Sequence, residues 1–312
     1  MLIIRGATLA GVAAAARLAR LGHEVTLVTD GDQVGGAGAL PDVIAVPAAW
    51  RDVFKKSGGH LQAELNRVHV ELVEALPREY VLADGSTLLL PGERGAQYRA
   101  VAERFGEAEA ARWRALVDDL DDLWHAYRRH ALEGIAPVAD ARDRAALWLD
   151  VTVGQLAERV DDRLAPIVLE AGGSPAAPAV EALSLSAERR FGRWRLVDGD
   201  GGALPGSLLL DLLARRIEER GVRLVERCES SPDLDATLPD RPLRAVSAED
   251  WLTRVPIVGS DGVVRASACS PAGPAPWAEL GSAALAVYEL HERLTGEDCR
   301  PTNVAFKLPR LA

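Results

Sequence analysis

The residues with the clearest chemical potential are glycines near the start of the chain. Gly6 and Gly11 hold the outer positions of the pattern G-x-G-x-x-G, and Thr8 stands at its middle position. In that pattern the glycines form a tight turn and let the backbone approach the pyrophosphate of a dinucleotide. The Cβ of Thr8 is expected to push the phosphates back, although its hydroxyl can donate one hydrogen bond. The sequence therefore predicts a dinucleotide site in which this contact is weakened.

A second polar position belongs with this turn. Dinucleotide sites carry an acidic residue, about twenty residues further on, that binds the ribose hydroxyls. Thr29 stands at the aligned position, and Asp30 follows one place later, where a continuing strand turns its side chain the other way. We predict that Thr29 and Asp30 lie at the ribose, with a weakened contact. A site that uses Asp30 for NAD(P) or another nucleotide stays open as an alternative.

The elements around these residues form a recognisable unit. Residues 2–4 are an apolar run typical of a buried strand, and Val12–Leu21 has apolar residues at helical spacing. Gly22 is expected to end that helix, and Val25–Val28 reads as a second strand. Strand, glycine turn, helix and strand make a βαβ unit, whose crossover is right-handed. We therefore predict an α/β fold with a Rossmann-like parallel sheet that binds FAD or NAD(P).

Composition limits the classes of function. The chain has 312 residues, of which 48% are hydrophobic and 26% charged, as in soluble globular proteins. Its net charge of −10 argues against nucleic acid or an anionic membrane as partner. The three cysteines are scattered, and no stretch resembles a secretory signal or a membrane span. We expect a cytoplasmic protein with a small-molecule substrate, and the sequence leaves a homo-oligomer or a protein partner open.

The middle of the chain interrupts the alternation of helices and strands. Asp84-Gly85 lies between two apolar runs, residues 80–83 and 87–90, which predicts a β-hairpin whose two turn positions need positive φ. Residues 229–245 contain three prolines and are expected to form a connecting loop.

A long amphipathic helix is predicted over residues 107–132. Trp113, Leu120 and Trp124 share its apolar face and are expected to be buried. Asp121 and His125 lie four residues apart and could share a metal, but no further ligand is near, so a solvated charge pair is expected instead.

Two later segments return to the first sheet. Residues 207–225 read as a helix followed by a strand, and a last helix is expected over residues 277–294. We predict a dinucleotide-binding core from residues 1–39 and 195–312. Residues 40–194 are predicted to be an inserted, mostly helical cap that contains the hairpin and faces the substrate.

The order and spacing of these landmarks resemble the FAD-dependent amine-oxidase and phytoene-desaturase superfamily. The segments that carry the resemblance are GATLAG at residues 6–11, DQVGG at 32–36, the hairpin, FGRWRLVDGDGG at 191–202, and SPAGPAPWAELGSAALAVYELHERLTG at 270–296. The resemblance covers most of the chain. It implies that the first βαβ unit, the double glycine and the N-terminus of the last helix surround FAD.

The resemblance also implies a set of cofactor contacts. They are Gly6, Thr8, Leu9, Ala10, Gly11, Thr29, Asp30, Gly35, Gly36, Gly273 and Trp277. Besides Thr8 and Thr29, two further positions depart from the family pattern, because Ala37 replaces a frequent basic residue and Ala266-Ser267 replaces a Gly-Asp pair. The chain is also shorter than the family between residues 225 and 263.

The function that the resemblance implies is that of a flavoprotein oxidoreductase, in which FAD accepts a hydride from a small apolar or amine substrate. The alternative is a non-catalytic relative with a degenerate FAD site that serves as an interaction or scaffold protein. FAD is the expected cofactor, NAD(P) is less favoured, and no metal is expected. The sequence identifies no catalytic residue.

Overall fold

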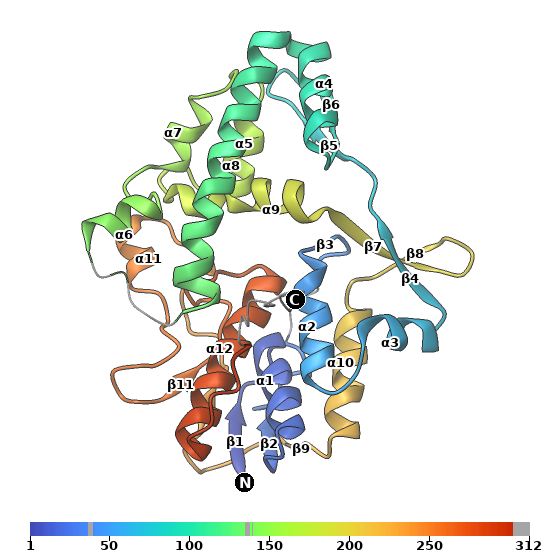
Figure 1. Ribbon diagram of the computed structural model, residues 1–312, viewed down its shortest axis with the longest axis vertical. Coiled ribbons are helices and arrows are strands. Elements are labelled where there is room, and N and C mark those ends of the chain that lie inside the picture. The colour runs from blue at the N-terminus through green and yellow to red at the C-terminus, as the bar shows by residue number, and fades with distance from the viewer. Residues whose placement is uncertain (37–39, 135–137, 139, 302–312) are drawn as a thin grey trace, which may run out of the picture.

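The computed structural model describes residues 1–36, 40–134, 138 and 140–301. Figure 1 shows a lobe built on a parallel sheet, with the N-terminus at its lower end, and a lobe of helices above it. An antiparallel sheet lies between the two lobes on one side. On the other side, the π-helical turn η1 (Arg128–Leu132) at the end of helix α5 (Glu107–Tyr127) contacts helix α12 (Pro276–Thr295).

The parallel sheet has five strands in the order β11-β10-β1-β2-β9. Every neighbouring pair in it is parallel, as the fold prediction requires. Its strands are β1 (Leu2–Arg5), β2 (Val25–Val28), β9 (Arg223–Val225), β10 (Leu234–Asp235) and β11 (Val264–Arg265). The predicted strands β1, β2 and β9 are confirmed. β10 corrects the expectation of a plain loop over residues 229–245, because Leu234 pairs with Ile4.

Three helices pack around this sheet: α1 (Leu9–Arg20), α10 (Leu208–Glu219) and α12 (Pro276–Thr295). Residues 9–18 of α1 are all buried, because α1 is covered by α12 and α10 as well as by the sheet. Its run of alanines, Ala13–Ala16, lets these neighbours approach closely. Gly22 follows α1 with a φ of 92°, as predicted, and Gly296 ends α12 in the left-handed region.

The antiparallel sheet joins the lobes. It comprises β3 (Ile44–Ala45), β4 (Val70–Glu74), β7 (Arg193–Asp198) and β8 (Ala203–Leu204), with β7 between β3 and β4. The helices α2 (Pro47–Lys56) and α3 (Leu61–Arg67) lie next to it. Trp50, Phe54 and Leu65 belong to the hydrophobic core of the parallel sheet. The division into residues 1–39 with 195–312 and residues 40–194 stays a prediction.

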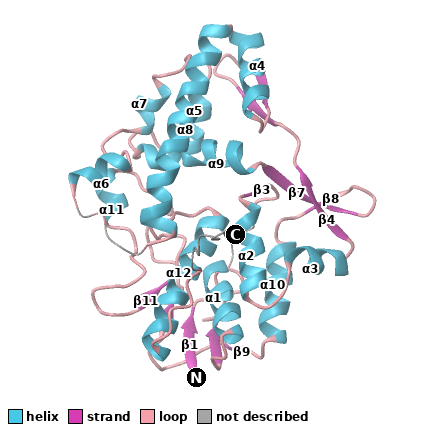
Figure 2. Ribbon diagram, in the orientation of Figure 1, coloured by secondary structure: helices cyan, strands magenta, loops and turns pink. Residues whose placement is uncertain are grey.

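The upper lobe is mostly helical, as Figure 2 shows. Its elements are β5 (Arg78–Val81), β6 (Thr87–Leu90), α4 (Arg94–Phe105), α5 (Glu107–Tyr127), the π-helical turn η1 (Arg128–Leu132), α6 (Ala141–Ala146), α7 (Val153–Ala157), α8 (Ala165–Gly172), the 3₁₀ turn η2 (Ala179–Leu183), α9 (Ser184–Phe191) and α11 (Ala248–Leu252). A second hydrophobic core fills this lobe and extends to Trp277 at the start of α12.

Two details of this lobe differ from expectation. The hairpin β5–β6 is confirmed, but only Gly85 of its turn has positive φ, and Leu82 donates its amide hydrogen to the Ser86 carbonyl at 2.8 Å. The connection is therefore longer than a two-residue turn. On α5, Asp121 is engaged by Ser186 and Arg189 rather than forming a solvated pair with His125.

The predicted apolar face of α5 is confirmed, since Trp113, Leu120 and Trp124 are buried. In the part of the chain that the structure describes, no group of three or more His, Cys, Asp or Glu residues could hold a metal ion. No helix within the same described residues has both the length and the apolar character needed to cross a membrane.

Candidate functional site

The turn between β1 and α1 has the geometry of a dinucleotide-binding fold. Gly6 has a φ of 97°, and a Cβ there would lie 2.6 Å from the backbone of Ala236. A Cβ at Gly11 would lie 2.0 Å from the carbonyl oxygen of Gly6. Both contacts are too close for any side chain, so the outer glycines are required by the packing of strand, turn and helix.

Thr8 caps helix α1. Its hydroxyl accepts a hydrogen bond from the Gly11 amide at 3.2 Å and donates one to the Ala236 carbonyl at 2.9 Å. The N-cap position of a helix favours threonine for the first of these bonds. The hydroxyl hydrogen, which the sequence left available for a phosphate, is therefore engaged by the loop after β10.

A cavity of about 450 Å³ opens beside this turn, at the carboxyl end of β1. Parallel α/β sheets bind their ligands at this edge. The predicted contacts that line the cavity come from three distant segments of the chain: Thr8 and Leu9, Gly35 and Gly36, and Gly273 and Trp277. The double glycine is held to the turn by a hydrogen bond from the Gly35 amide to the Ala7 carbonyl, at 2.5 Å.

Two helices point their N-termini into this cavity. Leu9 begins α1, Trp277 is the second residue of α12, and both line the cavity. The Leu9 amide faces the Gly35 carbonyl across the parallel β-bridge between Thr8 and Gly35, whereas the Trp277 amide has no hydrogen-bond partner among the described residues. The positive end of a helix dipole favours an anion. The backbone at this end therefore fits the phosphates of a dinucleotide.

The other predicted contacts do not line the cavity. Gly6, Ala10 and Gly11 belong to the turn and the first turn of α1. Thr29 and Asp30 follow β2, where the Thr29 hydroxyl accepts from the Gly31 amide at 3.4 Å.

Asp30 has a φ of 51°, and its carboxylate lies 3.7 Å from the Arg5 guanidinium. Asp30 is paired with Arg5 and does not line the cavity, so it is poorly placed to bind a nucleotide there. The assignment of all eleven predicted contacts to a cofactor stays a prediction.

The cavity also holds two carboxylates that sequence reasoning missed, Glu279 and Glu181. Burial raises the pKa of Glu279, although the amide of Ala10, which donates to its Oε1 at 2.9 Å, acts in the opposite direction. Burial also raises the pKa of Glu181, with Arg254 and the Ala245 amide opposing it. The available signal was the same for both, a single acidic residue inside an otherwise apolar run.

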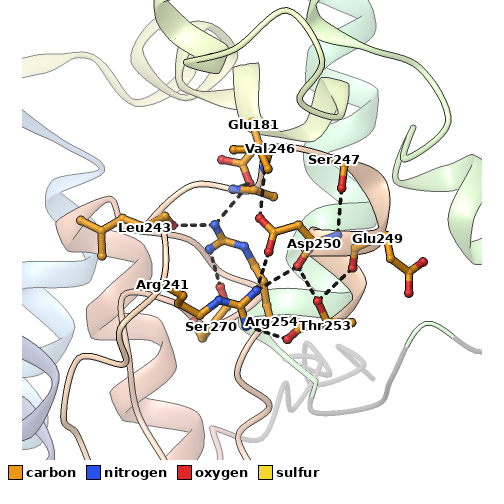
Figure 3. A network of polar contacts seen from close by, with 11 residues as sticks. Glu181, Arg241, Leu243, Val246, Ser247, Glu249, Asp250, Thr253, Arg254 and Ser270 are labelled. Carbon is orange, nitrogen blue, oxygen red and sulfur yellow. Dashed lines mark hydrogen bonds and ion pairs between the residues drawn. The ribbon is translucent and has the colours of Figure 1, made fainter.

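A polar network holds the wall of the cavity around Glu181 (Figure 3). The guanidinium of Arg254 is almost fully buried, donates to the Leu243 and Ser270 carbonyls, and lies 3.7 Å from the Glu181 carboxylate. Arg241 donates to the Asp250 carboxylate at 2.6 Å. These bonds fix the loop from residue 241 to residue 254, which carries Leu243 and Trp251 on the cavity wall.

Aromatic side chains form the end of the cavity towards the helical lobe. The ring of Trp277 lies 5.3 Å from that of Trp124 and 6.0 Å from that of Tyr127. The Tyr127 hydroxyl donates to the Ala272 carbonyl, and full burial raises its pKa well above the usual value. Tyr127 therefore stays neutral and holds the loop that leads into α12.

A second cavity, of about 440 Å³, adjoins the first and shares Leu40, Ser184 and Trp277 with it. Its lining adds apolar residues such as Trp50 and Ile44 and the charged residues Arg78, Glu188 and Arg193. Burial raises the pKa of Glu188, and Arg193 opposes the shift. The two cavities together extend between the parallel sheet and the helical lobe.

The chain is similar to two curated desaturases. It is 32% identical over 249 residues to hydroxyneurosporene desaturase of Cereibacter sphaeroides, a match that covers 71% of this chain and 48% of that protein. It is 28% identical over 250 residues to the enzyme of the same name from Rhodobacter capsulatus, with the same coverage. No family model matches the chain.

Among solved structures, the chain is similar to putrescine oxidase with putrescine bound, with a TM-score of 0.45 and 19% identity over 72% of this chain and 50% of that one. Nothing further is concluded from so distant a likeness. The similarity to two desaturases agrees with the desaturase part of the resemblance that the sequence motifs indicate, and the chain spans about half the length of these relatives.

Proposed function

We propose that this chain binds FAD in the cavity at the carboxyl end of β1 and works as an oxidoreductase of the desaturase or amine-oxidase type. The observation that carries the proposal is the convergence of Leu9, Gly36 and Trp277, from three distant segments, on one cavity with two helix N-termini. The similarity to two desaturases supports the same class of reaction. When bound, FAD supplies the chemistry of accepting a hydride from a carbon–hydrogen bond.

Different segments of the chain would bind different parts of the cofactor. The positive end of α1 at Leu9 would face the pyrophosphate, and the double glycine Gly35-Gly36 leaves room for the backbone to approach it. The Trp277 amide at the start of α12 would face electron-rich atoms of the ring system. Burial of this end by Trp277 and Tyr127 excludes water, which strengthens each of these interactions.

The substrate would enter from the second cavity. The apolar side chains of Trp50, Ile44 and Leu209 line it, together with the charged side chains of Arg78 and Glu188. Such a lining fits a mainly apolar molecule with one polar group, held between the sheet and the helical lobe. Because the chain spans only about half the length of the curated relatives it matches, the substrate of those proteins is not transferred to it.

A direct test is the absorbance of the purified protein, followed by titration with FAD and quenching of flavin fluorescence. A saturable binding curve with one FAD per chain is expected. Trp277→Ala should weaken it, because this change uncovers the flavin end. Trp148→Ala is a matched control, since Trp148 lies outside the cavity. The non-catalytic alternative predicts no saturable binding in any of the three proteins.

The remaining expectations stay predictions. They are a hydride transfer to flavin, a cytoplasmic location, and a homo-oligomer or protein partner. NAD(P) can be compared with FAD in the same titration, and we expect it to bind more weakly because Asp30 is paired with Arg5 outside the cavity.

A further inference from the structure

The N-terminus of α1 already holds an anion that belongs to the chain. Glu279, in the first turn of α12, accepts the Ala10 amide hydrogen through Oε1 at 2.9 Å. Thr8 accepts the Gly11 amide hydrogen, and the parallel bridge between Thr8 and Gly35 sets the Leu9 amide against the Gly35 carbonyl. The carboxylate therefore stands where the fold offers its strongest attraction for phosphate.

The position of Glu279 is fixed by packing rather than by a flexible surface contact. Helices α1 and α12 make the most extensive contact between any two elements of the structure. Ala278 and Leu280, on either side of Glu279, are buried in the two hydrophobic cores, and Glu279 itself lines the cavity. The carboxylate thus faces the space that the first phosphate of a dinucleotide would enter.

Charge makes the two anions incompatible at this point. A carboxylate and a phosphate that share one helix N-terminus repel each other across a buried, weakly screened space. The carboxylate also removes one backbone donor, the Ala10 amide, from the set available to the phosphate. A dinucleotide would have to bind without the Ala10 amide or displace the Glu279 side chain.

We propose that Glu279 is a built-in competitor for the phosphate site, and that it sets the affinity of this chain for its dinucleotide. The inference rests on the proposed function for the identity of the ligand. The contact itself, a half-buried glutamate on the first turn of α1, is independent of that identity. Removal of the carboxylate should free the Ala10 amide and the positive end of the helix for the ligand.

The test compares the wild type with Glu279→Ala and Glu279→Gln, each titrated with FAD and separately with inorganic pyrophosphate by calorimetry. Glutamine keeps an oxygen that can accept the Ala10 amide hydrogen but removes the charge. Glu297→Ala is the matched control, because it removes the same charge from an exposed residue beyond the end of α12. Thermal unfolding of each protein checks that it is folded.

We expect Glu279→Ala to bind FAD about ten- to a hundredfold more tightly than the wild type, which is the effect of one regained charged hydrogen bond. Glu279→Gln should also gain affinity, and Glu297→Ala should not. If Glu279→Ala does not fold, the test rests on whether Glu279→Gln binds FAD more tightly than the wild type. A wild type that binds FAD as tightly as both Glu279 variants overturns the inference and leaves the proposed function in place.

Pyrophosphate separates the two proposals. Binding of pyrophosphate to Glu279→Ala but not to the wild type, with no FAD binding to either, would support the role of Glu279 and refute the FAD function. A folded Glu279→Ala that binds neither ligand refutes both.

Discussion

Thr8 provides the sharpest test of how the turn is built. Thr8→Val keeps the shape of the side chain and removes only the hydroxyl. The change leaves the Gly11 amide without its cap, which costs about 1 kcal/mol. It also leaves the carbonyl of the fully buried Ala236 without its donor, which costs about 1–3 kcal/mol. The free energy of unfolding should therefore fall by about 2–4 kcal/mol.

The assay is urea unfolding, with Thr8→Ser as the matched control because serine retains the hydroxyl. We expect a lower midpoint for Thr8→Val at an unchanged slope, and a change of less than about 1 kcal/mol for Thr8→Ser. Equal stability of the valine and serine variants would refute the account of Thr8 as a structural cap. In that case a direct role of its hydroxyl at the phosphate would again be the better explanation.

Two further predictions follow from buried groups. Trp113→Ala should lower the free energy of unfolding by about 3–5 kcal/mol, because Trp113 is buried in the core of the helical lobe. Denaturant unfolding of this variant, compared with that of the wild type and of Trp113→Phe, measures the loss. Burial raises the pKa of Glu279, so the folded chain binds this proton at a higher pH than the unfolded chain. Acidification from about pH 7 to about pH 5 should therefore stabilise the wild type relative to Glu279→Gln. A stability difference that moves the other way would show the sign to be wrong.

The first βαβ unit could be predicted from the sequence because its signals are local. The apolar run of β1, the alanine-rich repeat of α1 and the glycine after it each fix one element, and their order fixes the crossover. The hairpin around Asp84-Gly85 and the buried face of α5 were visible for the same reason. Each depends on neighbours in sequence.

The contacts that the sequence could not give are those between distant segments. Strand β10 is two residues long, too short for any periodic pattern, and exists because β1 offers an unpaired edge. The pairing of Glu279 with Ala10 joins residues 269 positions apart. Nothing in the local pattern around Thr8 indicates that Ala236 accepts its hydrogen bond. Each of these pairings is set by tertiary packing between segments that are far apart in the sequence.

The central claim is that FAD binds where Leu9, Gly36 and Trp277 meet. Backbone hydrogen exchange, measured with and without saturating FAD in the wild type and in Glu279→Ala, tests this location most directly. The account predicts slower exchange in three separate segments, residues 8–11, 35–36 and 273–278, and a larger effect in the variant. Bound FAD that leaves these three segments unchanged, or that protects only residues elsewhere, would contradict it.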